Sequence, residues 1–264
     1  MGSPIAWIGT SGYVYPHWVG VLYPEGLPSR RWLAHYAQHF NAVELNVTFY
    51  RLPDPKIFQE WREQVPGGFR FILKGSRFIT HVRRLRDVDE AVVNFFLRAE
   101  PIRERLGGVL WQLPPRFRAD PARLAAFCRT LPPSVRHAFE FRDASWFTDA
   151  VFAHLQALDA AVVAADWPYQ VLLPDMEPEE IPRPVVRVPH TARWAYVRRH
   201  GPGAVYGSRY PDAMIRRDAA WVRAQLRAGR EVYVFYNNDV AGHAVRDALA
   251  LRRLVAGEDD GKHP

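Results

Sequence analysis

The sequence predicts an α/β protein of the closed (β/α)8 barrel type, the TIM barrel, in a single domain over residues 1–256. Two observations lead to this prediction. Short apolar runs alternate with segments whose apolar residues recur at helical spacing, which is typical of parallel βα units. There are eight such runs, and eight units in about 255 residues match the usual size of a closed barrel. An open, doubly wound sheet remains the alternative, because sequence periodicity does not report closure.

Each expected strand is a short run of mostly apolar residues bounded by turn-forming residues. Such strands are buried on both faces, so their pattern favours parallel strands covered by helices. The eight expected strands span residues 5–11, 42–46, 69–74, 108–112, 137–142, 161–166, 196–200 and 231–237.

Several of the intervening helices have recognisable starts. Ser29 is a candidate cap, and Asp54 and Asp120 each precede a proline whose fixed φ suits the first helical position. Between residues 166 and 196, six prolines predict that a long loop replaces the sixth helix. Further helices are expected over residues 88–106, with a kink or an end at Pro101, and over 148–158, 212–228 and 242–256.

The composition is that of a folded globular protein, with 48% hydrophobic and 24% charged residues. No apolar run approaches the roughly 18–20 residues of a membrane-spanning helix, and the first residues do not resemble a secretion signal. We therefore expect a cytoplasmic protein with no membrane partner. Cys128, the single cysteine, recurs at helical spacing with Leu124 and Leu131 and is interpreted as a core residue. The acidic residues 257–264 are expected to form a flexible tail.

The formal net charge of +7 favours anionic partners. All basic residues except Lys56, Lys74 and Lys262 are arginine. Arginine suits bidentate contact with phosphate or carboxylate groups. Genome base composition is the alternative explanation of the arginine bias.

Polar residues gather where the expected strands end. In a parallel barrel these ends form one rim, and alternate residues of each strand point inward. Polar side chains there are costly to bury unless they pair or bind a ligand. The set predicts a ligand site, and a purely structural network of ion pairs is the alternative.

Four residues of this rim are candidate catalytic groups: Glu44, Glu140, Asp166 and Lys74. The carboxylates could act as general acid and base if cations keep one ionised while burial keeps another protonated. Lys74 could form a Schiff base with a carbonyl substrate, although an ion-paired lysine is the simpler interpretation. The candidate substrate-binding residues are Ser11, Tyr13, Asn46, His81, Gln112, Arg142, Arg198, His200, Asn237 and Asn238.

No cofactor is expected. The rim carboxylates and His200 are ligand types for a divalent metal, but Lys74, Arg142 and Arg198 on the same rim would repel a cation. The sequence has no HExxH motif, and a lone cysteine excludes cysteine-based zinc ligation. Metal binding therefore stays an alternative.

A basic loop follows the third expected strand and includes Arg83, Arg84 and Arg86. It could contact phosphate groups, and the aromatic residues of the first loop could stack on bases. A nucleic-acid partner is therefore possible. A solvated loop without a ligand explains the same residues equally well.

Motifs spread over nearly the whole chain carry a family resemblance. In chain order they are Gly9-Thr10-Ser11-Gly12-Tyr13, Tyr15-Pro16, Trp18, Gly20, Tyr23-Pro24, the run from Glu44 to Pro53, Phe71-Ile72-Leu73-Lys74, Thr80-His81, Gln112-Leu113-Pro114-Pro115, Glu140-Phe141-Arg142, Trp146, Tyr196-Val197-Arg198, His200-Gly201 and Tyr236-Asn237-Asn238. This ordered set resembles the DUF72 family, also called YecE-like.

The resemblance implies a TIM barrel without a firmly assigned activity. Similarity to phosphodiester-cleaving endonuclease barrels and to sugar isomerase barrels has been suggested for the family. The sequence departs from the family pattern at Arg199, a position expected to point outward, and at Asp239, where a small hydroxyl residue is usual. The expected rim residues themselves are kept.

Three functional hypotheses follow. The first is an enzyme, of the hydrolase or the isomerase and lyase class, that acts on a small anionic, phosphorylated or carboxylated substrate through carboxylate acid/base chemistry. The second is a barrel that binds nucleic acid or processes phosphodiesters, whose binding should weaken steeply with salt. The third is a scaffold without catalysis, in which substitutions at the rim change stability only.

Overall fold

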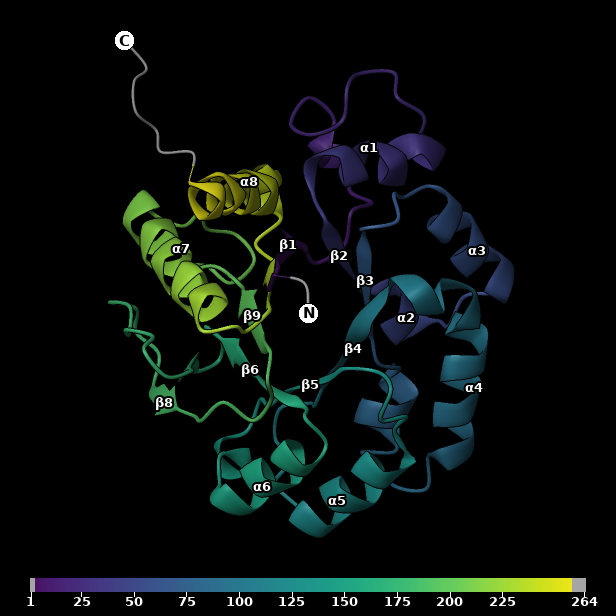
Figure 1. The fold of residues 1–264 in the computed structure, drawn as a ribbon, viewed down its shortest axis with the longest axis vertical. Coiled ribbons are helices and arrows are strands. Elements are labelled where there is room, and N and C mark those ends of the chain that lie inside the picture. Colours follow the sequence, from purple (N-terminus) through teal and green to yellow (C-terminus); the bar gives the residue numbers. More distant parts are fainter. Residues whose placement is uncertain (1–2, 258–264) are drawn as a thin grey trace.

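The computed structural model describes residues 3–257 and has the predicted barrel architecture, with helices arranged around a ring of parallel strands (Figure 1). The barrel strands are β1 (Ala6–Thr10), β2 (Ala42–Leu45), β3 (Arg70–Lys74), β4 (Leu106–Gln112), β5 (His137–Glu140), β6 (Ala161–Ala165), β9 (Ala195–Arg199) and β10 (Val232–Tyr236). All eight expected strands are confirmed. The expected tail at 258–264 lies outside the described residues, whereas Gly257 ends the last helix in a left-handed conformation.

The helices follow the strands in the expected order (Figure 1). They are α1 (Trp32–His39), α2 (Val47–Tyr50), α3 (Pro55–Glu63), α4 (Asp89–Ala99), α5 (Pro121–Thr130), α6 (Asp149–Ala157), α7 (Asp212–Arg227) and α8 (His243–Ala256). Shorter helical turns are η1 (Pro16–Trp18), η2 (Ser29–Arg31), the π-helix η3 (Phe78–Val82), η4 (Glu100–Arg105), η5 (Ala144–Trp146) and η6 (Val240–Gly242). None of the helices in residues 3–257 combines the length and apolar character needed to cross a membrane.

The cap predictions have mixed outcomes. The Asp54 and Asp120 side chains accept hydrogen bonds from Lys56 N and Arg123 N at the starts of α3 and α5. The Ser29 prediction is wrong, because Ser29 lies inside η2 and makes no capping bond with its side chain. As predicted from Pro101, α4 ends at Ala99 and continues as the tighter helix η4.

The helix that would follow β6 in a regular barrel is absent from the described structure, as the prolines predicted. An excursion between β6 and β9 instead contains a small parallel ribbon of β7 (Gln170–Leu172) and β8 (Val185–Arg187). Arg183 fastens this excursion to the barrel, because its guanidinium donates to the carbonyl oxygens of Asp166 and Gly201 at 2.5 and 2.8 Å.

Two side chains and a backbone hydrogen bond, from Gly12 N to Glu44 O at 2.7 Å, close the barrel between β1 and β2. The Tyr36 oxygen accepts a hydrogen bond from Thr10 N at 2.9 Å, and its hydroxyl donates to Ala42 O at 3.1 Å. The Asn41 amide accepts from Ile8 N at 2.9 Å and donates to Ala6 O at 2.8 Å. These two side chains thus stand in for ladder hydrogen bonds along the seam.

The core has two parts. An inner cluster fills the barrel and combines small residues such as Ala42 and Ala138 with a stack of Tyr196, Tyr233 and Trp7. A larger outer cluster packs the helices onto the strands and includes Cys128, as predicted. Burial raises the pKa of the Cys128 thiol to about 12, so this cysteine has little thiolate character.

We predict that Tyr36→Phe destabilises the protein, because the buried Thr10 N–H and Ala42 C=O at the seam would lose their partner. The expected loss is about 1–3 kcal/mol in the free energy of unfolding, measured by urea denaturation. Tyr50→Phe is the matched control, since Tyr50 is exposed. Equal stabilities of the two variants would contradict the proposed closure.

Candidate functional site

Most of the predicted site residues meet at the C-terminal end of the barrel. Seven of them form one hydrogen-bonded group, which we call the rim cluster, and each is at most 4% exposed. Its members are Ser11, Glu44, Glu140, Arg142, Asp166, Arg198 and His200. The inward alternation inferred from the sequence is therefore confirmed for all of these residues except Asp166. On β6 the alternation is wrong, because Val162 and Ala164, which share its parity, pack in the outer cluster. Asp166 nevertheless reaches the rim cluster from the position directly after the strand.

Arg198 on β9 is the centre of the rim cluster. Its guanidinium contacts both carboxylate oxygens of Glu44, with Nε to Oε2 at 3.0 Å and Nη2 to Oε1 at 2.7 Å. Its Nη1 donates to Oε2 of Glu140 at 2.5 Å. The hydroxyls of Ser11 and Tyr196 also donate to Glu44, at 2.8 and 2.7 Å. Both oxygens of the Glu44 carboxylate are thus occupied by donors.

Arg142 is the second cation of the rim cluster. It pairs with Oε1 of Glu140, and its guanidinium carbon lies 4.2 Å from the ring centre of Trp167. Its Nη2 donates to Nε2 of His200 at 3.1 Å, and Arg198 Nη1 donates to the same nitrogen at 3.1 Å. Two guanidinium groups therefore point at one imidazole nitrogen, which must be the unprotonated one.

His200 is held neutral by this arrangement. With Nε2 accepting, Nδ1 carries the proton and donates to Oδ1 of Asp166 at 3.2 Å. Burial, together with the positive charges of Arg198 and Arg142, lowers the pKa of His200 to about 4, although the hydrogen bond to Asp166 opposes this effect. The Tyr210 hydroxyl donates to the other Asp166 oxygen.

Glu140 and Asp166 both have pKa values below their usual range. Burial alone would raise the pKa of Glu140, but Arg142 and Arg198 hold it far below its usual range. Burial alone would also raise the pKa of Asp166, but the hydrogen bond from His200 helps to lower it below its usual value. The expectation that burial keeps one carboxyl group protonated is therefore wrong for these two residues, which are not poised as general acids.

Lys74 differs from the expected ion-paired lysine. Within residues 3–257 no carboxylate lies at ion-pair distance from its ammonium, which instead lies 4.4 Å from the ring centre of Phe49. Burial lowers the pKa of Lys74 to about 8, and the repulsion by Arg198 adds to this effect against the attraction of Glu44 and Glu140.

Two buried polar atoms near Lys74 also lack partners. The pairing of β2 with β3 places Asn46 beside Lys74, one position after the paired residues Leu45 and Leu73. Neither Asn46 Oδ1 nor Arg142 Nη1 has a hydrogen-bond partner among the described residues. Buried polar atoms without partners are unfavourable in a protein interior, so these groups suggest a place where a ligand or water binds.

The remaining predicted residues divide into two groups. His81 lies at the rim, with its ring 4.9 Å from that of Phe49, and Gln112 ends β4 in register with Glu140. Tyr13 does not face the rim, because its ring packs 6.2 Å from Tyr36 in the outer core.

Asn237 and Asn238 were predicted at the rim, but neither makes a hydrogen bond with the rim cluster among the described residues. The Asn238 amide donates to Ser208 O and to Asp247 on α8, so it fastens a loop and does not reach the rim cluster. For Asn237 the structure gives a backbone contact, from its N–H to Arg199 O at 2.7 Å.

Three residues of the site were missed from the sequence. Tyr196 precedes Arg198 by two positions on the same inward face, so the alternation of β9 could have found it. Trp167 and Tyr210 lie in irregular loops and carry no periodic signal. Tyr15 lies nearer the site than Tyr13 does, since its hydroxyl donates to Ser11 O at 2.8 Å.

A metal centre is not assembled in the described part of the chain. No group of three or more His, Cys, Asp or Glu side chains in residues 3–257 is placed to hold an ion. The rim carboxylates are instead oriented toward arginines.

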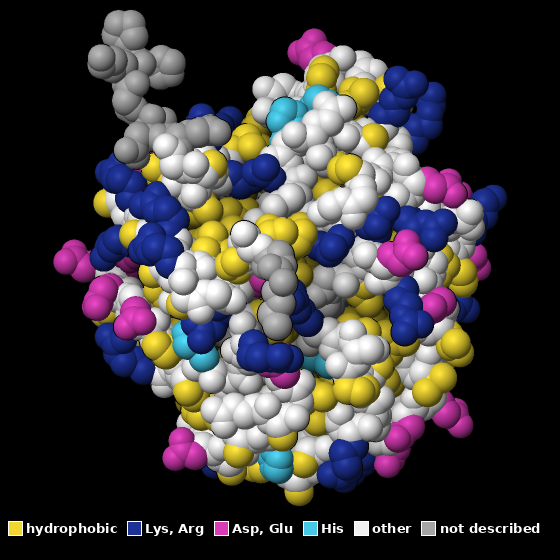
Figure 2. Space-filling model, in the orientation of Figure 1, with side chains coloured by type: hydrophobic (Ala, Val, Ile, Leu, Met, Phe, Trp, Pro, Cys, Tyr) yellow, Lys and Arg dark blue, Asp and Glu magenta, His cyan; other side chains and the backbone are white. Residues whose placement is uncertain are grey.

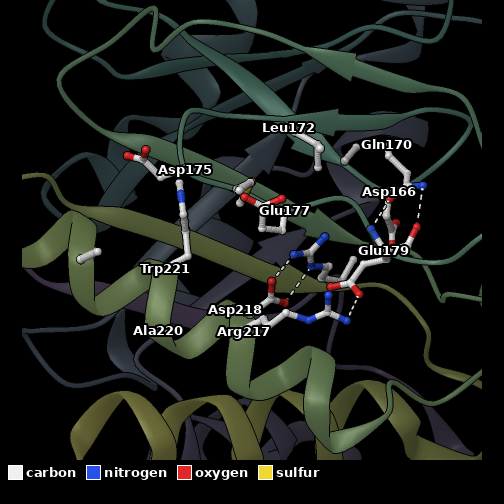
Figure 3. Close-up of a pocket in the computed structure, with 14 residues that line it drawn as sticks. Asp166, Gln170, Leu172, Asp175, Glu177, Glu179, Arg217, Asp218, Ala220 and Trp221 are labelled. Carbon is white, nitrogen blue, oxygen red and sulfur yellow. Dashed lines mark hydrogen bonds and ion pairs between the residues drawn. The ribbon is translucent and has the colours of Figure 1, made fainter.

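A cavity of about 280 Å³ lies outside the barrel wall, between the excursion after β6 and helix α7 (Figure 3). Arg199 points outward into this region, as expected, and makes a bidentate ion pair with Asp218 of α7. Arg217 pairs with Glu179 of the excursion. These ion pairs join the excursion and α7 to the barrel, so the cavity has a structural explanation in the missing sixth helix.

We predict that Arg198→Met lowers the free energy of unfolding by about 3–5 kcal/mol, because Glu44 and Glu140 would be left as buried charges without their shared cation. Arg193→Met is the matched control, since the Arg193 side chain is 91% exposed and pairs with Asp159 only at the surface. Urea denaturation of both variants tests this. Similar stabilities would show that the rim carboxylates do not depend on Arg198.

Comparison with known proteins places this site in a family context. Over residues 7–264 the chain matches the family described as "Protein of unknown function DUF72". The UPF0759 protein YecE of Escherichia coli K12 is 37% identical over 144 residues, which are 53% of this chain and 50% of that protein. The UPF0759 protein YunF of Bacillus subtilis is 29% identical over 135 residues, 48% of each chain. The chain thus spans about half the length of these curated relatives.

Solved structures extend the likeness over nearly the whole chain. A DUF72 family protein from Thermotoga maritima has a TM-score of 0.78 and 29% identity, covering 96% of this chain and 99% of that one. A DUF72 family protein from Enterococcus faecalis has a TM-score of 0.78 at 20% identity, covering 96% of both chains, and shows the shared fold. Because the DUF72 family model matches residues 7–264, nearly the whole chain, this protein belongs to the DUF72 family.

Proposed function

We propose that this protein is an enzyme that acts on a small substrate with a phosphate or carboxylate group, bound at the C-terminal rim of the barrel. The observation that carries the proposal is Lys74, a partly buried lysine without a carboxylate partner beside two arginines. A cation that is withdrawn from water without a carboxylate partner costs stability. Such groups are characteristic of ligand and catalytic sites.

The substrate anion would bind where donors are unsatisfied. Arg142 Nη1 and the Lys74 ammonium supply such donors, and Trp167 holds the Arg142 guanidinium from one side. The ion pairs of the rim cluster keep these groups in place before the substrate arrives. Preorganised donors of this kind stabilise negative charge that develops during a reaction.

Lys74 is the best candidate for the group that moves a proton. With a pKa of about 8, about a quarter of the Lys74 side chains are neutral at pH 7.5, so the amine can act as a base near neutral pH. It would take a proton from a carbon that carries a hydroxyl group next to a substrate carbonyl, while the electron pair moves to the carbonyl oxygen and Arg142 stabilises the resulting enediolate. Return of that proton to the former carbonyl carbon, with transfer of the hydroxyl proton to the enediolate oxygen, would complete an isomerisation.

The carboxylates have a different role in this proposal than the sequence suggested. Glu44 and Glu140 would hold the arginines in position, and Asp166 would fix the tautomer of His200. They act as positioning residues, whereas Lys74 carries the acid/base chemistry.

We predict that Lys74→Met raises stability at pH 7 and abolishes ligand binding. The pKa of Lys74 is about 8 in the folded protein and about 10.4 in an unfolded chain. The unfolded chain therefore binds more protons between these values, so stability rises with pH there and the charged lysine costs stability at pH 7. Removing the charge should stabilise the protein by about 1–2 kcal/mol in urea denaturation.

A thermal-shift screen of phosphorylated and carboxylated metabolites at pH 7.5 tests the predicted loss of ligand binding in Lys74→Met. Lys56→Met is the matched control, because Lys56 is exposed on α3. A ligand that raises the melting temperature of the wild type and of Lys56→Met, but not of Lys74→Met, supports the proposal. Unchanged binding in Lys74→Met would contradict it.

A further inference from the structure

The loops after β3 and β4 form a strongly basic part of the surface. Residues 75–88 and 113–123 contain seven arginines and only two carboxylates, Asp87 and Asp120. Within them lies a cavity of about 430 Å³ lined by Val82, Arg83, Arg84, Arg86 and Arg123, which we call the arginine hollow.

The arginine hollow keeps an excess of positive charge. Arg83 pairs with Asp87 at 3.1 Å, and Arg123 pairs with Asp120 at 3.0 Å. Arg84 and Arg86 have no ion pair among the described residues, and both are exposed. Two guanidinium groups thus remain available to an incoming anion.

Two of the guanidinium groups are held in place before any ligand binds. The guanidinium carbons of Arg84 and Arg123 lie 5.7 and 5.6 Å from the ring centre of Phe117, which is buried. Contacts of this kind reduce the side-chain freedom that a long arginine would lose on binding.

The backbone of the loop is constrained as well. Arg84, Leu85 and Asp87 have φ angles of 49°, 68° and 49°, in the left-handed region that non-glycine residues rarely adopt. The buried Leu85 side chain and the hydrogen bond from Leu85 N to Ile79 O at 2.9 Å anchor this conformation. Backbone strain of this kind costs stability and is found most often at functional sites.

Another basic region of the molecule also has guanidinium groups over aromatic rings, but its arginines already have hydrogen-bond or ion-pair partners. On the face in Figure 2, Lys and Arg side chains gather near the centre, where the N-terminal part of the chain enters the barrel. A cavity at this end is lined by Arg70, Arg103 and Arg136, among others. Arg70 donates to backbone carbonyls, while Arg103 and Arg136 pair with Glu100 and Glu231. All three of these arginines are already occupied.

We propose that the arginine hollow is a second anion-binding subsite, which binds a phosphoryl group. Arginine matches the oxygens of phosphate through paired N–H donors, and several guanidinium groups around one cavity suit a dianion better than a single carboxylate. The hollow also adjoins the rim. Val82 lines it, and the preceding residue, His81, contacts Phe49, the ring on which Lys74 lies.

This position gives the substrate class. If Lys74 binds the reacting part of the substrate, a step that rests on the proposed function, the substrate carries a phosphoryl group some distance from its reacting carbon. The phosphoryl group itself would bind the hollow whether or not the rim is catalytic.

Isothermal titration calorimetry with inorganic phosphate at pH 7.5 tests the subsite, with sodium chloride keeping the ionic strength constant. The test variant is Arg84→Gln/Arg86→Gln. The control is Arg216→Gln/Arg227→Gln, which removes the same charge from exposed positions of α7. We expect saturable phosphate binding to the wild type and the control, and at least tenfold weaker binding to the test variant, with circular dichroism spectra unchanged.

The Lys74→Met variant separates this inference from the proposed function. A phosphate-binding event that persists in Lys74→Met and is lost in Arg84→Gln/Arg86→Gln supports the subsite even if the rim has no activity. Equal weakening in both charge-removing double variants would overturn the proposal, because it indicates non-specific attraction. Binding of a ten-nucleotide single-stranded DNA without any binding of phosphate would also overturn it, in favour of a nucleic-acid surface.

Discussion

The ion pairs of Arg198 are the constraint on which the rest of the rim depends. A single buried guanidinium on β9 joins Glu44 of β2 and Glu140 of β5, strands that are not neighbours in the barrel. Charges are costly in an interior unless their partners and hydrogen bonds are complete. At Arg198 they are nearly complete, with Ser11 and Tyr196 donating to the same carboxylate and His200 accepting from the guanidinium. The charge of Arg198 contributes to the shifted pKa values of Lys74, Glu140 and His200.

The saturation of this network explains why Lys74 stands apart. Both rim glutamates are already bound by arginines, so Lys74 lies among charges without a direct carboxylate partner. Burial and the neighbouring arginines then lower the pKa of its ammonium group. The same cations keep His200 neutral and Glu140 ionised. One structural feature therefore produces both the rigid part of the site and its reactive part.

The sequence was informative about the fold and the faces of strands, but not about partners. Alternation along each strand correctly placed Glu44, Glu140 and Arg198 inside the barrel. It could not show that both glutamates would pair with one arginine and leave Lys74 without a carboxylate, because that depends on which strands face each other across the barrel. Loop residues were the least predictable. Tyr13 packs in the outer core, and Trp167 packs against the Arg142 guanidinium. Both residues lie in irregular segments, where no sequence periodicity indicates which way a side chain points.

The most direct test of this account is the ionisation of Lys74 in the folded protein. The chain has only three lysines, so a protein labelled with carbon-13 at the lysine ε position should give few and well-separated signals, with Lys74→Met assigning the relevant one. A titration by NMR from pH 6 to 11 should give Lys74 a pKa of about 8, below the value of about 10.4 that is typical of a lysine in an unfolded chain. A value for Lys74 at or above about 10.4 would mean that the lysine is ion-paired, and would contradict the proposed site.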